Sequence, residues 1–248
     1  MKCIVLAAGY ATRLYPITLN TPKPLLEVAG RTILDRIVDK IEIVPYIDQI
    51  IVISNDLFYQ NFVKWKSSYK GSKEITIIND LTRSNETRLG AIKDICFAIH
   101  HLQIQDNVIV LAGDNLFDFE LLDFVNYYNF IQTDCITSHL MEDVERIKRT
   151  GVAQIDSNNL LLSFEEKPKY PKSMYAVPPF YIYQKETLPL LDQFLQEGNN
   201  GDAPGMLLSW LLTKRPIHVF LFQGERFDIG TIDTYHEVQD IFINKEKI

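Results

Sequence analysis

The sequence predicts an α/β fold with a mostly parallel mixed sheet that is flanked by helices. In the first half, short apolar runs alternate with amphipathic segments, as in repeated strand–helix–strand units. In the second half, strand signals follow one another with turn residues between them, which indicates an added antiparallel part. The 248 residues are 46% apolar, enough to bury the core of one large domain.

Apolar runs of strand length define the expected sheet of the first half. The strands are residues 2–7, 50–53, 75–78 and 108–112. The helices between and after them are residues 32–43, 57–69, 88–102 and about 120–130. Each helix shows apolar residues at helical spacing, for example Ile92, Ile95 and Ile99. Because strands and helices alternate, we expect these strands to run parallel.

The pattern changes near residue 145, within what we expect to be a single domain. The turn 156–159 separates two strands, 152–155 and 160–164, and predicts a hairpin. Further strands are expected at 177–183 and 217–222, and helices at 186–196, 203–212 and 231–243. Asp202 is a reasonable cap for the helix from 203.

Composition narrows the class of protein. The net charge of −7 argues against non-specific nucleic-acid binding, so an anionic substrate needs a local positive site. The three cysteines lie far apart, which argues against a zinc site or a disulfide framework. The longest early apolar run has six residues, too short for a signal peptide, and no membrane span is visible, so we expect a cytoplasmic protein. The sequence is compatible with a homo-oligomer.

The segment after the first strand favours phosphate binding. Small residues there let backbone amides approach a phosphate chain, and Arg13 and Lys23 add positive charge. The expected nucleotide-binding residues of this loop are Ala7, Ala8, Gly9, Tyr10, Ala11 and Thr12. A plain strand-to-helix turn with surface cations is the alternative. No GxGxxG fingerprint or Walker A loop is present, which argues against a hydride-transfer enzyme.

Two carboxylates follow strand signals far apart in the sequence. Asp114 comes after Gly113 at the end of the fourth strand, and Asp228 precedes a turn and a helix. Carboxylates at the mouth of a sheet are hard oxygen ligands of the kind that Mg²⁺ prefers. As alternatives, Asp114 is a turn residue and Asp228 a turn or helix-cap residue.

Four sequence blocks together resemble the sugar-1-phosphate nucleotidyltransferases, which include glucose-1-phosphate thymidylyltransferase and short bacterial cytidylyltransferases. The blocks span residues 6 to about 236. They are residues 6–14 with 16–18 and 23–26, Gly113-Asp114-Asn115, Glu166-Lys167-Pro168 and Asp228-Ile229-Gly230. Ala11 stands where the family's second glycine is usual.

The resemblance implies a Rossmann-like nucleotidyltransferase domain with a small acceptor-binding β part. Residues 1–145 would form the nucleotide-binding half and residues 146–248 the acceptor-binding half. Arg13, Lys23, Asp114 and Lys167 would be catalytic, and Asp114 and Asp228 would share one Mg²⁺. Glu166, Lys167 and Tyr181 would bind the acceptor substrate. The partners would be a nucleoside triphosphate and a small phosphorylated acceptor, with pyrophosphate released.

The substrate-reading segments depart from the family pattern. Pro178 and Pro179 replace a small polar residue and a glycine that approach the sugar, so we expect a small acceptor other than a hexose 1-phosphate. The alternative is a sugar phosphate whose hydroxyls are bound by side chains such as Glu166 or Tyr175. Asn79, Asn85 and Arg88 lie in the base-reading segment, and asparagine side chains can pair with cytosine, which favours CTP. The alternative is that both asparagines only form turns.

Two other functional classes remain open. The chain could be a non-catalytic regulatory subunit that binds nucleotide sugars, although Arg13, Lys23, Asp114 and Asp228 are all present. It could also be an NAD-dependent oxidoreductase, although the glycine fingerprint is absent. A titration with NADH tests the second.

Overall fold

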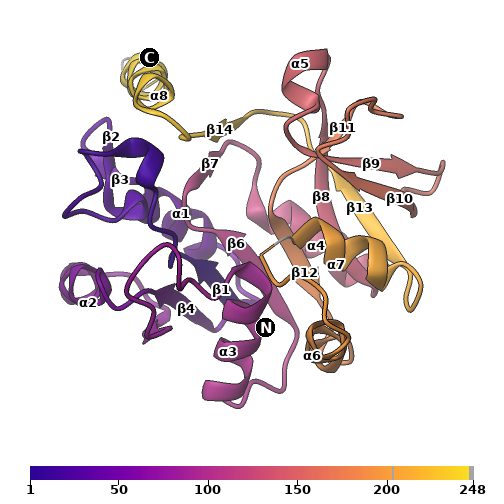
Figure 1. Cartoon of the computed structure of the whole chain (residues 1–248), viewed down its shortest axis with the longest axis horizontal. Coiled ribbons are helices and arrows are strands. Elements are labelled where there is room, and N and C mark those ends of the chain that lie inside the picture. The colour runs from indigo at the N-terminus through magenta and orange to yellow at the C-terminus, as the bar shows by residue number, and fades with distance from the viewer. Residues whose placement is uncertain (203, 246–248) are drawn as a thin grey trace.

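The computed structural model describes residues 1–202 and 204–245 and contains a ten-stranded mixed sheet (Figure 1). Its strand order is β10 (Leu161–Glu166), β9 (Gly151–Ile155), β11 (Tyr175–Val177), β8 (Asp134–Leu140), β12 (Phe180–Tyr183), β6 (Val108–Ala112), β1 (Lys2–Leu6), β4 (Gln49–Ser54) and β5 (Glu74–Asn79), with β13 (Ile217–Leu221) paired to β8. Neighbours from β6 to β5 are parallel, and those from β10 to β6 along this path are antiparallel. The predicted α/β class is confirmed.

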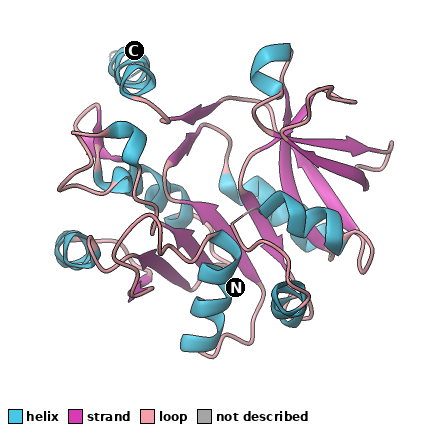
Figure 2. Cartoon of the chain, viewed as in Figure 1, coloured by secondary structure: helices cyan, strands magenta, loops and turns pink. Residues whose placement is uncertain are grey.

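Helices flank the strands on both sides (Figure 2). They are α1 (Ile33–Glu42), α2 (Tyr59–Ser68), α3 (Ala91–His101), α4 (Leu121–Ile131), α5 (Val144–Ile147), α6 (Leu188–Gln196), α7 (Pro204–Leu211) and α8 (Ile232–Lys245), with short 3₁₀ helices η1 (Thr12–Leu14) and η2 (Lys23–Leu25). No helix in the described ranges is long and apolar enough to cross a membrane.

Two apolar clusters cover the opposite faces of the sheet. Cys3 and Val5 of β1 pack with α1, α2 and α4, whereas Ile4 packs with α3, α6 and α7. This division follows from the strand geometry, because successive side chains point to opposite faces. The three cysteines are buried and free.

Local sequence signals explain several element boundaries. Thr32 caps α1 through a capping box with Asp35, whose backbone N–H donates to Thr32 Oγ1 at 3.0 Å. The hairpin at 156–159 is confirmed, since Asp156 Oδ1 accepts N–H groups from Asn158 and Leu160, each at 2.8 Å. The predicted helix start at residue 88 is wrong. α3 begins at Ala91 because Gly90 has a φ of +93° outside the helical region.

The single strand predicted at 177–183 is in fact two strands. β11 ends at Val177 and pairs with β9 and β8, and β12 begins at Phe180 and pairs with β8 and β6. Pro178 and Pro179 separate them because proline has no N–H to donate to a strand ladder. The break leaves Pro179 beside the end of β6, where its carbonyl accepts from the N–H of Ala112 at 3.2 Å.

Strand β8 is a central strand that the sequence did not predict. Its buried residues include the polar Thr137 and Ser138, so the apolar run that signals a buried strand is interrupted. The sequence also did not predict four short strands: β2 (Glu27–Val28), β3 (Arg31–Thr32), β7 (Asn115–Phe117) and β14 (Arg226–Asp228). The predicted helix from residue 203 is present as α7, although Ala203 lies outside the described residues.

Candidate active site

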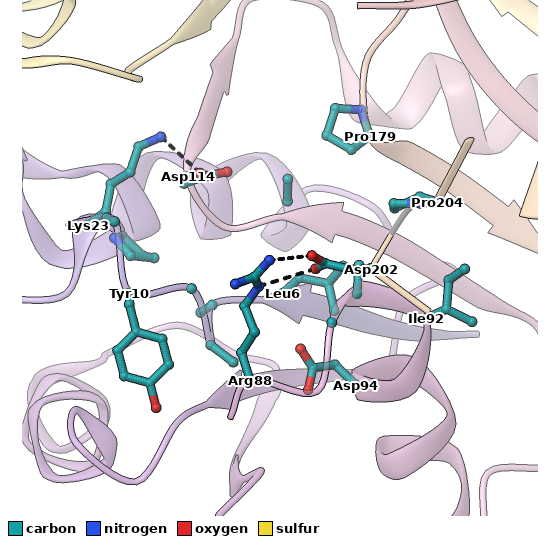
Figure 3. Close-up of a pocket in the computed structure, with 18 of the residues that line it drawn as sticks. Leu6, Tyr10, Lys23, Arg88, Ile92, Asp94, Asp114, Pro179, Asp202 and Pro204 are labelled. Atoms are coloured by element: carbon teal, nitrogen blue, oxygen red, sulfur yellow. Dashed lines mark hydrogen bonds and ion pairs between the residues drawn. The ribbon is translucent and has the colours of Figure 1, made fainter. Parts of the chain in front are cut away.

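A pocket of about 570 Å³ lies beyond the carboxyl ends of β1 and β6 (Figure 3). In an open α/β sheet this edge is where ligands bind. Most of the predicted site residues line it: Ala7, Ala8, Gly9, Tyr10, Ala11, Thr12, Arg13, Lys23, Asn85, Arg88, Asp114 and Tyr181. The structure therefore brings together residues that are up to 174 positions apart, from Ala7 to Tyr181.

The loop after β1 has the shape of a phosphate cradle. Ala11 has a φ of +46°, the left-handed conformation that a glycine adopts more easily, and Thr18 Oγ1 donates to its carbonyl at 2.9 Å. A Cβ placed on Gly9 would meet nothing within 4 Å, so the backbone there faces open space. Arg13 is exposed at the pocket and, among the described residues, has no hydrogen-bond or ion-pair partner. The loop thus offers accessible backbone and a free guanidinium.

Four charged side chains alternate in sign beside this loop, and we call them the charge cluster: Lys23, Asp114, Arg226 and Asp228. Lys23 Nζ lies 2.8 Å from Asp114 Oδ2 and 3.9 Å from Asp228 Oδ1. Arg226 Nη2 lies 2.9 Å from Asp228 Oδ2. Although burial alone would raise the pKa of Asp114, the Lys23 ammonium and hydrogen bonds from Lys23 and Asn115 lower it. Asp114 is therefore ionised at neutral pH.

A small two-stranded sheet sets the distance between the two carboxylates. β7 and β14 pair antiparallel, with Asp228 opposite Asn115, the neighbour of Asp114. Both carboxylates reach the same Lys23 ammonium, so their oxygens converge. Two converging carboxylates fit Mg²⁺, which usually takes one or two of them together with waters and substrate phosphates. No group of three or more His, Cys, Asp or Glu side chains that could hold a metal occurs in residues 1–202 and 204–245.

The base-reading segment is only partly at the pocket. Asn85 lines it, but Asn79 does not. The Asn79 amide donates to Asp56 Oδ1 at 2.7 Å, and its carbonyl accepts from the N–H of Leu81 at 2.8 Å. Both groups of Asn79 are thus occupied in the turn after β5, which was the alternative that the sequence left open.

Arg88 bridges the two halves of the chain across the pocket. Its guanidinium pairs with Asp202, with Nε 3.4 Å from Oδ1 (Figure 3). The backbones also approach closely, because a Cβ on Gly90 would lie 2.8 Å from Asp202 Cα. Asp202 was expected to cap the following helix, but its carboxylate pairs with Arg88.

The residues expected to hold the acceptor lie at different depths. Tyr181 is buried and lines the pocket, whereas Glu166 and Lys167 are not among its lining residues. Lys167 is 66% exposed, has a φ of +47°, and its Nζ lies 3.6 Å from Glu166 Oε1. The Glu166 carboxylate packs against Gly205 at the start of α7.

Three side chains at or beside the pocket were missed from the sequence. Arg226 belongs to the charge cluster, and the short strand that carries it gave no pattern signal. Asp94 and Tyr183 line the pocket, each with a buried oxygen that has no hydrogen-bond partner in the described part of the chain. Asp94 had a usable signal, because it is a charged residue one position from Ile95 on the apolar side of the helix.

The chain is similar to known proteins in sequence and in fold. A family model described as "Nucleotidyl transferase" matches residues 2–245. The proteins that resemble the chain include the "Bifunctional protein GlmU" of Methanococcus aeolicus, 29% identical over 82% of this chain and 44% of that protein. The "Bifunctional protein GlmU" of Methanococcus maripaludis is 30% identical over 99% of this chain and 55% of that protein. The chain spans about half the length of these two relatives.

A solved structure shows the same fold. A UDP-glucose pyrophosphorylase in complex with UDP-glucose superimposes with a TM-score of 0.81, covering 98% of both chains at 20% identity. At this identity the likeness concerns the arrangement of helices and strands.

Proposed function

The chain belongs to the nucleotidyl transferase family, and on that premise we propose that it transfers a nucleotidyl group from a nucleoside triphosphate to a small phosphorylated acceptor. The observation that carries the proposal is the meeting of the phosphate loop with Lys23 and Asp114 at one pocket, while Asp228 does not line it but reaches the same Lys23 ammonium. CTP is the proposed donor. The acceptor is a sugar 1-phosphate or a small phosphate or phosphonate.

The reaction is an in-line displacement at phosphorus. A phosphate oxygen of the acceptor bonds to the α-phosphorus of the triphosphate, the bond from the α-phosphorus to the bridging oxygen breaks, and pyrophosphate leaves. The attacking oxygen is already anionic, so no general base is needed. The protein must hold two anions together and stabilise the charge that develops between them.

Different residues at the pocket perform different parts of this task. The N–H groups of the 7–12 loop and the Arg13 guanidinium hold the β- and γ-phosphates. Lys23 lies deeper, 6% exposed, where its ammonium faces the α-phosphate and stabilises the leaving oxygen. Asp114 and Asp228 would hold Mg²⁺, which when bound supplies charge neutralisation at the reacting phosphates. Arg226 orients the Asp228 carboxylate through their ion pair.

The acceptor enters on the side of Tyr181 and the Glu166–Lys167 pair. Lys167 is the proposed anchor for the acceptor phosphate, and Glu166 and Tyr181 are the proposed contacts to the rest of the molecule. Pro179 lines the pocket here and has no N–H to offer. A polyhydroxylated ring would lose partners at this wall, which favours a small acceptor over glucose 1-phosphate.

A pyrophosphate-release screen tests the proposal. ATP, CTP, GTP and UTP are each combined with Mg²⁺ and with phosphocholine, glucose 1-phosphate or 2-aminoethylphosphonate. We expect release with CTP and a small acceptor, and loss of release with EDTA. Binding of nucleotide sugars without any release would instead favour the regulatory subunit, and saturable binding of NADH would favour the oxidoreductase.

A further inference from the structure

The phosphate loop after β1 contains a run of backbone N–H groups that the protein itself does not use. The N–H of Ala7 donates to the carbonyl of Ile53 at 3.0 Å, which continues the pairing of β1 with β4. The N–H groups of residues 8–13 have no hydrogen-bond partner among residues 1–202 and 204–245. The run includes two buried residues, Ala8 and Tyr10, and buried backbone N–H groups are nearly always paired. The loop therefore has donors available for a ligand.

Two buried side chains hold this loop from the interior of the protein. Asn55, directly after β4, is 0% exposed, and its Nδ2 donates to the carbonyl of Ala8 at 2.9 Å. Its Oδ1 accepts from the N–H of Phe58 at 3.0 Å, so the amide group is itself fixed at both ends. Thr18 is also 0% exposed, and its Oγ1 donates to the carbonyl of Ala11 at 2.9 Å. Each side chain thus holds one carbonyl of the loop toward the interior.

Asn55 determines where the N–H of Gly9 points. In a planar trans peptide, the C=O of one residue and the N–H of the next point in opposite directions. The peptide between Ala8 and Gly9 is trans, so its N–H points away from Asn55. Gly9 is exposed and lines the pocket, and a Cβ placed on it would meet nothing within 4 Å. A phosphate oxygen can therefore reach this donor.

Thr18 has the same effect at the other end of the loop. The carbonyl of Ala11 that it holds also accepts from the N–H of Leu14 at 2.9 Å. Ala11 is in the left-handed conformation, which a residue with a Cβ keeps only where its surroundings hold it there. The peptide between Ala11 and Thr12 is trans, so the N–H of Thr12, an exposed residue that lines the pocket, points away from Thr18.

We propose that Asn55 and Thr18 are positioning residues, which hold the N–H groups of Gly9 and Thr12 toward the phosphates of the nucleotide. This inference rests on the proposed function, because it takes the phosphate loop to bind the triphosphate and, through the same donors, the pyrophosphate product. Neither Asn55 nor Thr18 lines the pocket, so each acts through a peptide group. Donors that are fixed before the ligand binds need no reorganisation when charge develops during the reaction.

The two non-backbone groups of Thr18 separate positioning from a purely structural role. Thr18→Val keeps a similar shape and loses the hydroxyl, and the carbonyl of Ala11 remains paired with the N–H of Leu14. Its affinity for inorganic pyrophosphate should fall by about tenfold, the effect of losing one hydrogen bond to a charged group. Thr18→Ser keeps the hydroxyl and loses a buried methyl group, so it should melt at a lower temperature and retain the wild-type affinity.

Asn55→Ala tests the other end of the loop and should also weaken pyrophosphate binding by about tenfold. Asn61→Ala is the matched control, because the Nδ2 of Asn61 donates to a backbone carbonyl outside the loop, that of Asn20, at 3.1 Å. It should bind pyrophosphate as the wild type does. Thermal melting checks that each variant is folded, and the two Thr18 variants decide the question if Asn55→Ala does not fold.

Calorimetry with pyrophosphate and Mg²⁺ measures these affinities without a nucleobase or an acceptor, and NMR follows the amide protons of Gly9 and Thr12. In the wild type both protons should move downfield when pyrophosphate binds, as expected for charge-assisted hydrogen bonds. The shift should be lost for Gly9 in Asn55→Ala and for Thr12 in Thr18→Val. Unchanged affinity and shifts in the folded variants, or equal weakening in Thr18→Ser and Thr18→Val, overturn the inference alone. No binding of pyrophosphate or of any triphosphate to the wild type would overturn the proposed function as well.

Discussion

Two polar regions at and beside the pocket differ in how their charges are satisfied. One is the charge cluster, and the other is a group of three carboxylates that we call the acidic group: Asp80, Asp94 and Asp202, of which Asp94 and Asp202 line the pocket. In the charge cluster, Lys23 and Arg226 neutralise Asp114 and Asp228 within 4 Å. In the acidic group, Asp202 pairs with Arg88, Asp80 is held by hydrogen bonds from Thr82, and Asp94 retains an unpartnered oxygen.

This difference separates two electrostatic environments. In the charge cluster, Lys23 lowers the pKa of Asp114 against the effect of burial, and Arg226 holds Asp228 in place, so the cluster is prepared for a cation and for phosphate charge. In the acidic group, burial and the neighbouring carboxylates raise the pKa of Asp94, whose Oδ1 has no partner among the described residues. Changes in the charge cluster should therefore affect turnover, and a change at Asp94 should affect the pH dependence of stability.

The largest expected effect comes from the charge cluster. Asp114→Asn removes one of two converging carboxylates and leaves Lys23 without its closest partner. Turnover, measured as pyrophosphate release at saturating Mg²⁺, should fall by at least about 10²-fold, as when one preorganised charge-stabilising group is lost. Added EDTA should abolish the wild-type activity, and Mg²⁺ should restore it. Wild-type turnover in a folded Asp114→Asn protein would show that this carboxylate is not part of the reaction.

A smaller loss of activity is expected when Arg13 is replaced, because its side chain has no hydrogen-bond or ion-pair partner among the described residues. Arg13→Ala should reduce kcat/KM for the triphosphate by about tenfold to a hundredfold, the range for a charge-assisted hydrogen bond. Because the guanidinium is exposed at the pocket, circular dichroism and the melting temperature should remain those of the wild type. Arg149→Ala, at another exposed arginine, is the control and should leave both kinetics and fold unchanged. An unfolded Arg13→Ala protein would assign Arg13 a structural role.

The sequence predicted the parallel strands β1, β4, β5 and β6 because short apolar runs are local signals. A shared site for Asp114 and Asp228 was predicted only from the resemblance to a family. The strand pair β7–β14, which joins them in space, consists of two three-residue strands with no periodicity to detect. The burial of Asp94 depends on how α3 packs against the rest of the chain, which the spacing of apolar residues in the helix does not show. A buried carboxyl that lacks a hydrogen-bond partner can be identified only when its neighbours in space are known.

The pH dependence of protein stability also distinguishes Asp94 from the charge cluster. Burial, together with Asp80 and Asp202, raises the pKa of Asp94 to about 8. In the unfolded chain the pKa is about 4, so between these values the folded protein binds a proton that the unfolded chain does not. The free energy of unfolding that Asp94 contributes is thus fully present below about pH 4 and declines as the pH rises toward 8.

Asp94→Asn removes this pH dependence because the amide does not ionise. Relative to the wild type, the variant should gain stability progressively from pH 4 to pH 8, on the order of 5 kcal/mol at the upper end, since about four pKa units at about 1.36 kcal/mol each are involved. Urea unfolding at several pH values measures the difference. Asp123→Asn, in an exposed position, should show no comparable trend. A constant difference between wild type and Asp94→Asn across this range would mean that Asp94 is not held protonated in the folded state.

The smallest expected effect concerns Asn79, the residue that the sequence favoured as a base reader. Its amide and carbonyl are both occupied by Asp56 and by the N–H of Leu81, and its side chain does not line the pocket. Asn79→Ala should therefore change the ratio of CTP to UTP binding by less than about twofold, although the turn after β5 loses two hydrogen bonds. Calorimetric binding of CTP and of UTP to the wild type and to the variant measures this ratio. The hydrogen bond from Asn79 also lowers the pKa of Asp56, so the variant should raise that pKa, which NMR titration can follow. A rise in the Asp56 pKa without a change in nucleotide ratio would confirm that Asn79 acts on the turn and not on the base. A ratio that collapses in Asn79→Ala would instead assign base reading to Asn79 at the end of β5.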